Sequence, residues 1–143
     1  MVMLRMPYMR IGGIQLFPSP ILSYLQTDGS FYHRSKKSRV AFILATPRGK
    51  YEKVLDIQNA STSTETEWAS IAYGLEYSLE KGERMLAIEN DNLGVVSSLI
   101  TRKKLRQDYA KHYRNEILTM AKQTEWTGIR WIPREQNHAD KLF

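Results

Sequence analysis

The chain has 143 residues, of which 21 are Lys or Arg and 15 are Asp or Glu, so its formal net charge is +6. This length suits a single domain, and the positive charge favours polyanionic partners through long-range attraction. There is no cysteine, which excludes disulfides, thiolate zinc sites and a cysteine nucleophile and agrees with the cytoplasmic location that we expect. No apolar run approaches the roughly 20 residues of a membrane span, so we expect no membrane association.

The first twenty residues differ from the rest of the chain. They contain four Met and no acidic residue, and Arg5 and Arg10 interrupt the apolar core that a secretory signal would need. We interpret residues 1–20 as a loosely ordered N-terminal extension and residues 21–143 as one domain.

The first half of that domain predicts three strands on short turns. Residues 21–27 are rich in apolar side chains and end at Asp28-Gly29, and residues 39–45 form a continuous apolar run. Residues 50–58 follow the turn signal Pro47-Arg48-Gly49. Such short connections indicate antiparallel pairing.

The second half alternates helices with strands. Residues 64–81, 92–100 and 105–120 carry apolar side chains at helical spacing, whereas residues 85–88 and 128–132 predict short strands. This alternation indicates parallel pairing. The predicted fold class is therefore α/β, with a mixed five-stranded sheet, three antiparallel strands followed by parallel ones, flanked by helices.

Four acidic residues fall where such a sheet would bring them together. They end the first strand, lie in the first turn of the first helix, follow the fourth strand and lie near the start of a final helix: Asp28, Glu67, Asp91 and Asp140. Strand ends and helix starts converge at one edge of an α/β sheet, where ligands bind. Four carboxylates there would repel one another, and the hard cations Mg²⁺ or Mn²⁺ would relieve that repulsion.

Each of these residues also has a purely structural interpretation. Asp28-Gly29 could be a turn, and Glu67 could complete a capping box that begins at Thr64. Asp91 could cap the following helix, and Asp140 could favour the positive end of the last one. These separate interpretations leave the joint placement of the four residues unexplained.

Four short motifs resemble, in order, those of type 1 ribonuclease H. They are Thr27-Asp28-Gly29-Ser30, Ser63-Thr64-Glu65-Thr66-Glu67-Trp68-Ala69, Ile88-Glu89-Asn90-Asp91-Asn92 and Pro133-Arg134-Glu135-Gln136-Asn137-His138-Ala139-Asp140. The resemblance covers residues 21–143. Four motifs in order, with fitting secondary structure, are a strong signal.

The resemblance implies a metal-dependent endonuclease that hydrolyses the RNA strand of RNA–DNA hybrids, leaving 5′-phosphate and 3′-hydroxyl ends. Asp28 would bridge two metal ions, with Glu67 and Asp91 completing one site and Asp140 the other. Two ions about 4 Å apart suit in-line phosphoryl displacement. We expect a monomer whose partner is the hybrid.

The same resemblance implies which residues meet the hybrid beside the metals. Backbone groups near Gly29 and the polar side chains of Ser30, Ser63 and Thr64 would line its minor groove, where the 2′-hydroxyl distinguishes RNA from DNA. Glycine at position 29 would also permit a close approach of the backbone.

The sequence departs from the family pattern in the loop before the last Asp. Many members carry a His there that aids water activation or product release, whereas this loop offers Glu135, with His138 as the alternative. Because Glu89 and Asn90 flank Asp91, a shifted ligand assignment is an alternative at that position. Only three residues follow the last Asp, so a final helix would hold it less firmly than the other ligands.

Two basic segments could contact phosphates. One joins the second and third helices and contains Arg102, Lys103 and Lys104, which we predict to bind substrate. The other is residues 33–39, in the turn after the first strand. The alternative for each is a solvated turn whose charge serves solubility.

Two other function classes compete with this prediction. One is a different nuclease on the same sheet, such as a junction resolvase or a transposase-like enzyme, because a fold does not fix an activity. The other is a non-catalytic nucleic-acid-binding module. Glu67 and the ending from Asn137 to Asp140 argue against the first. The acidic set argues against the second, since a binder of phosphates gains nothing from clustered negative charge.

Overall fold

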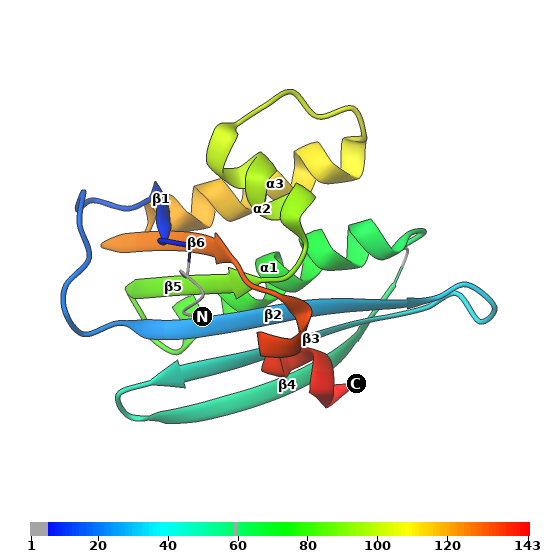
Figure 1. Cartoon of the computed structure of the whole chain (residues 1–143), viewed down its shortest axis with the longest axis horizontal. Helices are drawn as coiled ribbons and strands as arrows, with labels where there is room; N and C mark the ends of the chain where they lie inside the picture. Colours follow the sequence, from blue (N-terminus) through cyan, green and yellow to red (C-terminus); the bar gives the residue numbers. More distant parts are fainter. Residues whose placement is uncertain (1–5, 59) are drawn as a thin grey trace, which may run out of the picture.

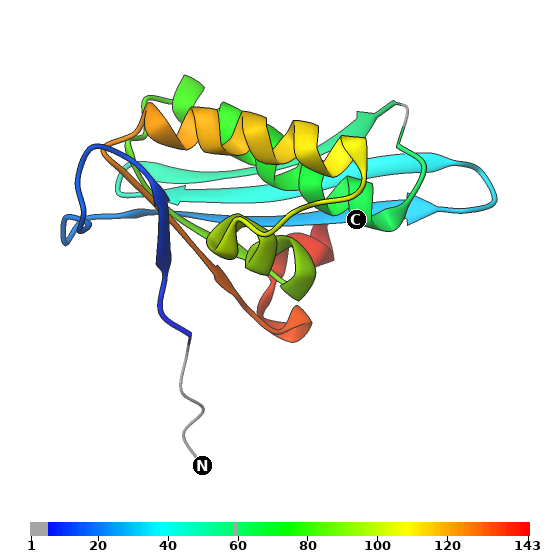
Figure 2. The ribbon, with the colours of Figure 1, turned by 90° about the horizontal axis from the view of Figure 1, so that it is seen from above.

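The computed structural model describes residues 6–58 and 60–143 (Figure 1). These residues contain one six-stranded sheet with the strand order β1-β6-β5-β2-β3-β4. Helices cover one face of the sheet, and the short C-terminal segment lies on the other (Figures 1 and 2). The predicted α/β class with a mixed sheet is confirmed.

Three long strands form the predicted antiparallel meander. They are β2 (Ser23–Tyr32), β3 (Lys37–Thr46) and β4 (Gly49–Ile57). Asp28 pairs with Ala41 in the middle of the β2–β3 hairpin, so the interpretation of Asp28-Gly29 as a turn is wrong. The strand continues because Ser30-Phe31-Tyr32 still find partners in β3.

The two inner strands are parallel, as the alternation of elements predicted. β5 (Met85–Asn90) pairs with β2, and β6 (Trp126–Trp131) pairs with β5. Parallel neighbours place their carboxyl ends at the same edge of the sheet. That edge is where the predicted acidic residues emerge.

Three helices pack with one sheet face into a single hydrophobic core. They are α1 (Ser63–Glu80), α2 (Leu93–Thr101) and α3 (Asp108–Lys122). The core contains fully buried Leu25, Phe42, Ile71, Ile88 and Ile117, and burial of such side chains is the main favourable term in folding. No described helix has the length and apolar character needed to cross a membrane.

The expected final helix is replaced by two 3-10 turns, η1 (Arg134–Gln136) and η2 (His138–Leu142). A five-residue segment makes too few helical hydrogen bonds to sustain an α-helix. Instead, Ala139 packs against Ala41 and Ile43 on the sheet face opposite the helices. This contact fixes the C-terminal segment beside the carboxyl end of β2.

The sheet has one strand more than expected. β1 (Met9–Gly12) lies within the segment interpreted as an extension, and it pairs with β6, with Met9 opposite Ile129. Ile11 is buried in the core, and a Cβ at Gly12 would lie only 2.7 Å from that of Ala121. A four-residue strand is too short for its periodicity to show in the sequence.

Candidate active site

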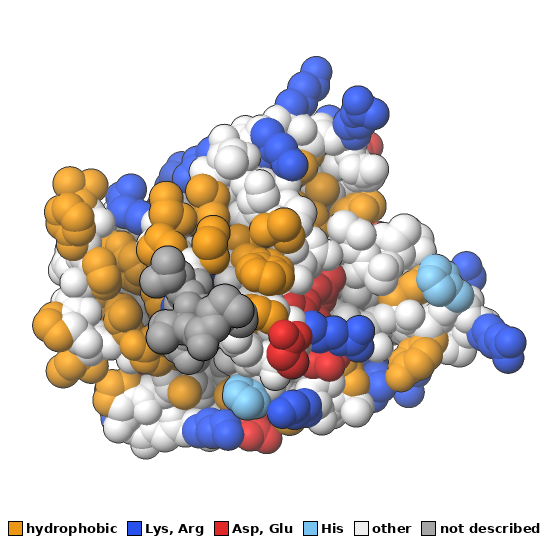
Figure 3. All heavy atoms as spheres, in the orientation of Figure 1, with side chains coloured by type: hydrophobic (Ala, Val, Ile, Leu, Met, Phe, Trp, Pro, Cys, Tyr) orange, Lys and Arg blue, Asp and Glu red, His pale blue; other side chains and the backbone are white. Residues whose placement is uncertain are grey.

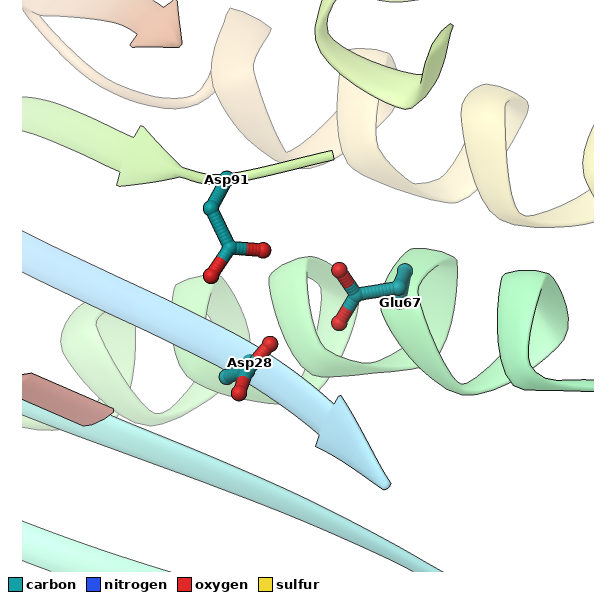
Figure 4. A group of neighbouring side chains, drawn as sticks. All are labelled: Asp28, Glu67 and Asp91. Atoms are coloured by element: carbon teal, nitrogen blue, oxygen red, sulfur yellow. The ribbon is translucent and has the colours of Figure 1, made fainter. Parts of the chain in front are cut away.

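The candidate site lies where β5 ends beside β2. The two strands are paired as far as Thr27 opposite Asn90, after which β2 continues toward the hairpin tip. The Asn90 amide donates to the carbonyl oxygen of Thr27 at 3.1 Å and to its hydroxyl at 2.9 Å. These bonds tie the strands together at the point where they part. Asp28 follows Thr27 on β2 and Asp91 follows the end of β5, and Figure 4 shows their carboxylates directed into one space.

The N-terminus of α1 is capped by residues other than Glu67. The Thr62 hydroxyl accepts a hydrogen bond from the Glu65 N–H at 3.1 Å, and the Glu65 carboxylate accepts from the N–H of Ser61 at 3.2 Å. The cap therefore lies two residues earlier than the sequence pattern indicated. The interpretation of Glu67 as a cap is wrong, and its carboxylate is available for another role.

Glu67 instead faces the end of the β2–β5 pair. Its carboxylate accepts a hydrogen bond from the Gly29 N–H, at a level of β2 that lies beyond the last residue of β5. A Cβ at Gly29 would lie 2.4 Å from the Thr66 carbonyl carbon. Glycine is thus required here for the close approach of β2 to α1, which brings Glu67 into the site.

Carboxylate oxygens of Asp28, Glu67 and Asp91 all lie within 4.8 Å of one another (Figure 4). We call these three residues the carboxylate trio. They come from a strand, a helix and the loop after a second strand, and the first two are buried, with 6% and 8% of their surface exposed. Among the described residues, these three form a group that could hold a metal ion.

Burial and nearby negative charges raise the pKa of every member of the trio. Loss of solvent raises the pKa of Asp28 to about 7, and the charges of Asp91 and Asp140 contribute to this rise. Burial and the nearby Asp28 raise the pKa of Glu67 well above its ordinary value. Burial also raises the pKa of Asp91, although a hydrogen bond from Asn137 opposes it. The trio therefore resists being fully ionised at neutral pH unless a cation compensates its charge.

Asp140, the fourth predicted acidic residue, lies beside the trio in η2. Its charge contributes to the raised pKa of Asp28, and its Oδ2 lies 3.4 Å from the Nε of Arg134. Its side chain is 30% exposed, so this carboxylate faces the solvent side of the site. It lies outside the tightest group of oxygens.

Asn137 connects this C-terminal segment to the trio. It is 1% exposed, and its amide donates to the Thr27 carbonyl at 2.9 Å and to Oδ2 of Asp91 at 3.2 Å. Its side-chain oxygen accepts from the Ala139 N–H. One side chain thus orients a member of the trio and starts the turn that carries Asp140. The motif resemblance contained Asn137 and Asn90, but assigned neither a role, because short polar side chains show no positioning function until their partners are known.

The two candidates for an auxiliary role, Glu135 and His138, line the same cavity. Glu135 and His138 are exposed and line a cavity of about 280 Å³. The described lining of this cavity also contains Gln26, Glu89 and Arg130 but no member of the trio. The structure therefore brings Glu135 and His138 to one cavity without distinguishing their roles.

Glu89, the alternative to Asp91, is held by other partners. It is 7% exposed and receives hydrogen bonds from Arg130 Nε at 2.8 Å, from the Tyr8 hydroxyl at 2.8 Å and from Gln26 at 2.9 Å. These contacts lower its pKa, although burial opposes them. Nothing in the sequence indicated this buried ion pair, because its members are distant in the chain.

The polar residues predicted to contact substrate surround the same edge. Ser30 follows the trio along β2 and is partly exposed, while Ser63 and Thr64 are exposed in the first turn of α1. The N–H of Gly29 donates a hydrogen bond to the Glu67 carboxylate. The absence of a side chain at Gly29 allows β2 to approach α1 closely.

The linker between α2 and α3 is exposed, and part of it serves the fold. Arg102 adopts a left-handed backbone conformation at the end of α2, and its guanidinium donates to the Ile11 carbonyl at 3.1 Å. The Lys103 carbonyl accepts from Arg114. The side chains of Lys103 and Lys104 are exposed.

A set of clustered carboxylate oxygens is a ligand set for hard divalent cations. Mg²⁺ and Mn²⁺ prefer such oxygens, and a bound cation would relieve the cost of burial and of nearby negative charge that raises the pKa of these carboxyls. The oxygens of the trio lie close enough together to hold one ion. The composition excludes a thiolate site.

Comparison with known proteins identifies the fold and the family. A family model described as reverse transcriptase-like matches residues 26–142. RNase H1 from the halophilic archaeon Halobacterium salinarum NRC-1 superposes with a TM-score of 0.77 at 19% identity, covering 84% of this chain and 92% of that one. The N-terminal RNase H domain of rv2228c from Mycobacterium tuberculosis gives 0.77 at 21% identity, covering 85% and 90%.

A third structure was solved with a nucleic acid. LC11-RNase H1, isolated from compost by a metagenomic approach, was crystallised in complex with an RNA/DNA hybrid. It has a TM-score of 0.73 and 17% identity, covering 84% of this chain and 92% of that one. No curated protein matches the sequence. Because the family match spans most of the chain and the structures share its fold, this protein belongs to the ribonuclease H-like family described as reverse transcriptase-like.

Proposed function

We propose that this protein is a divalent-metal-dependent endonuclease that hydrolyses the RNA strand of RNA–DNA hybrids. The carboxylate trio carries the proposal, because three separate elements deliver acidic side chains to one partly buried space. Burying like charges together costs stability. None of the three acts as the turn or cap residue that its local sequence suggested.

Asp28, Glu67 and Asp91 would hold one ion, and Asp28 with Asp140 a second. When bound, such ions supply Lewis-acid stabilisation for in-line displacement at a phosphodiester. The protein's own contribution is to fix the ligands before substrate arrives. The Gly29 N–H orients Glu67, the Asn137 amide orients Asp91, and the bonds from Asn90 to Thr27 fix the separation of the strands. Ligands held in this way do not need to reorganise during the reaction.

Two observations support a hybrid as the substrate. The structurally similar LC11-RNase H1 binds an RNA/DNA hybrid. In this chain, Ser30, Ser63 and Thr64 present hydroxyl groups beside the trio, where they can exchange hydrogen bonds with a 2′-hydroxyl that DNA lacks. We propose cleavage that leaves 5′-phosphate and 3′-hydroxyl ends.

The test compares end-labelled RNA–DNA hybrid, duplex DNA and duplex RNA, each with Mg²⁺, with Mn²⁺ and with EDTA. Asp28→Asn is the matched control, since it removes one charge from the trio at nearly constant volume. We expect the wild type to cut the RNA strand of the hybrid with either cation. We expect no cleavage by the wild type in EDTA and none by the variant under any condition. Efficient cleavage of duplex DNA would favour the resolvase or transposase-like alternative. Binding without cleavage under every condition would favour a non-catalytic module.

A further inference from the structure

The β2–β3 hairpin extends beyond the carboxylate trio at the same edge of the sheet. From Asp28, β2 continues to Tyr32, and the chain turns and returns in β3 from Lys37. Figures 1 and 2 show the tip of this hairpin projecting past the other strands. At about 3.3 Å per residue, Tyr32 lies roughly 13 Å beyond Asp28, and the turn lies a few ångström further.

The projecting part of the hairpin is basic. Residues 33–39 contain four Lys or Arg and one His, and no acidic residue: His33, Arg34, Lys36, Lys37 and Arg39. Lys and Arg side chains and a His gather at the end of the molecule toward which the hairpin projects (Figure 3). Within residues 6–58 and 60–143, none of the five forms an ion pair. Their charge is not neutralised by the fold.

One face of the hairpin continues the surface that carries Asp28. Residues two apart on a strand share a face, so Ser30 and Tyr32 lie on the side of Asp28, and their cross-strand partners Arg39 and Lys37 lie there too. The guanidinium of Arg39 lies 5.9 Å from the centre of the Tyr32 ring and 5.4 Å from that of Phe143. Its buried Nε has no hydrogen-bond partner in the described chain. The two rings hold this guanidinium in place, and it forms no ion pair within the described residues.

We propose that this hairpin, in addition to the α2–α3 linker, binds phosphates of the substrate duplex at a distance from the cleaved bond. The inference rests on the proposed function and deepens it. When one phosphate of a duplex is bound at the trio, the rest of the duplex extends away from the site, and its other phosphates lie at increasing distances from the trio. The basic groups at the tip, from Lys37 opposite Tyr32 outward, begin about 13 Å away and meet phosphates roughly four to six base pairs along, at 3.4 Å per pair. The contrast with the α2–α3 linker supports this assignment, because Arg102 there is committed to the backbone of β1.

The test removes the three exposed charges at the tip in the variant Arg34→Gln/Lys36→Gln/Lys37→Gln. The matched control is Lys50→Gln/Lys111→Gln/Lys122→Gln, which removes the same charge from three exposed positions on β4 and α3. Affinity for a labelled hybrid is measured by fluorescence anisotropy without divalent metal, and kcat and KM are measured with Mg²⁺, each over a range of salt. The anisotropy does not depend on turnover.

We expect the tip variant to bind more weakly, with a log–log salt dependence lower by up to about 0.9 for each phosphate that is no longer neutralised. Its KM should rise while kcat holds, the sign of uniform binding loss, and the control should match the wild type. A further substrate is a hybrid whose ribonucleotides lie in one short block. Shortening the duplex on one side of that block to under roughly four base pairs should abolish the difference in affinity and KM between the tip variant and the wild type. This length follows from the reach of the hairpin.

The phosphate-binding role of the hairpin and the proposed function fail in different ways. If the wild type cuts hybrid but the tip variant keeps its KM and salt dependence, that role is refuted and the proposed function stands. The role is also refuted if the control loses as much affinity as the tip variant, because the effect is then one of net charge. If the wild type cuts no hybrid, the proposed function itself fails.

Discussion

At the scale of single residues, Glu67 shows how position overrides a local motif. Its sequence fits a capping box, yet Thr62 and Glu65 make the cap, and Glu67 accepts from Gly29 inside the site. The variant Glu67→Gln keeps an acceptor for Gly29 but loses the charge. We therefore expect kcat to fall by on the order of 100-fold or more, the scale of removing one electrostatic group from an active site, without any loss of thermal stability.

Thr62→Ala provides the opposite control. It removes the helix cap, which is typically worth about 1 kcal/mol of stability, and leaves the carboxylate trio intact. We expect a lower melting temperature and nearly normal kcat, so that steady-state kinetics and thermal melts separate the two roles. Near-normal turnover of Glu67→Gln would remove this residue from the site.

At the scale of elements, the linker between α2 and α3 combines a structural and a binding role. Lys103 and Lys104 are exposed, whereas Arg102 holds β1 through the Ile11 carbonyl. For Lys103→Gln/Lys104→Gln, we expect a higher KM, an unchanged kcat and a weaker salt dependence, because phosphate contacts position a duplex without taking part in the reaction.

Arg102→Gln separates the structural role of the linker. It leaves the Ile11 carbonyl without its donor, so the expected effect is a loss of stability of about 1 to 3 kcal/mol, measured by denaturant unfolding. If the double Lys variant keeps both the KM and the salt dependence of the wild type, the linker is a solvated connection. The basic contacts to phosphates would then come from the β2–β3 hairpin.

At the scale of the whole molecule, the carboxylate trio makes the stability of the metal-free protein depend on pH. The pKa of Asp28 is raised from an ordinary value near 3.8 to about 7, so the folded state binds more protons than the unfolded state between these values. Stability contributed by the protonated group is present at low pH and is lost as pH rises toward 7. We expect the melting temperature without metal to fall over this interval.

The comparison with Asp28→Asn isolates this effect, because the variant cannot ionise at that position. The melting temperature of the variant should exceed that of the wild type at pH 8 without metal, and the difference should vanish near pH 4. The opposite contribution of Glu89, whose pKa is lowered, is common to both proteins and cancels. Added Mg²⁺ should stabilise the wild type more than the variant at pH 8. Equal melting curves at every pH would show that Asp28 is not under electrostatic strain.

Most of the secondary structure and the set of acidic residues could be predicted from the order of amino acids alone. Period-2 and helical patterns record which face of each element is buried, so β2 to β6 and the three helices were predicted near their observed places. The order of the four acidic motifs also indicated the family, which the match over residues 26–142 confirms. These features are local or follow from chain order, and such information is present in the sequence.

Features that depend on partners distant in the chain emerged only in the folded molecule. β1 was missed because a four-residue strand is defined by its pairing with β6. Glu67 lies in the site because Gly29 allows β2 to approach α1 closely. Asn137 has a positioning role because it contacts Thr27 and Asp91. The β2–β3 turn also lay beyond Asp28-Gly29, since cross-strand hydrogen bonds outweigh the turn preference of an Asp-Gly pair. Packing and pairing energies between distant residues exceed local propensities, and no single segment contains both partners.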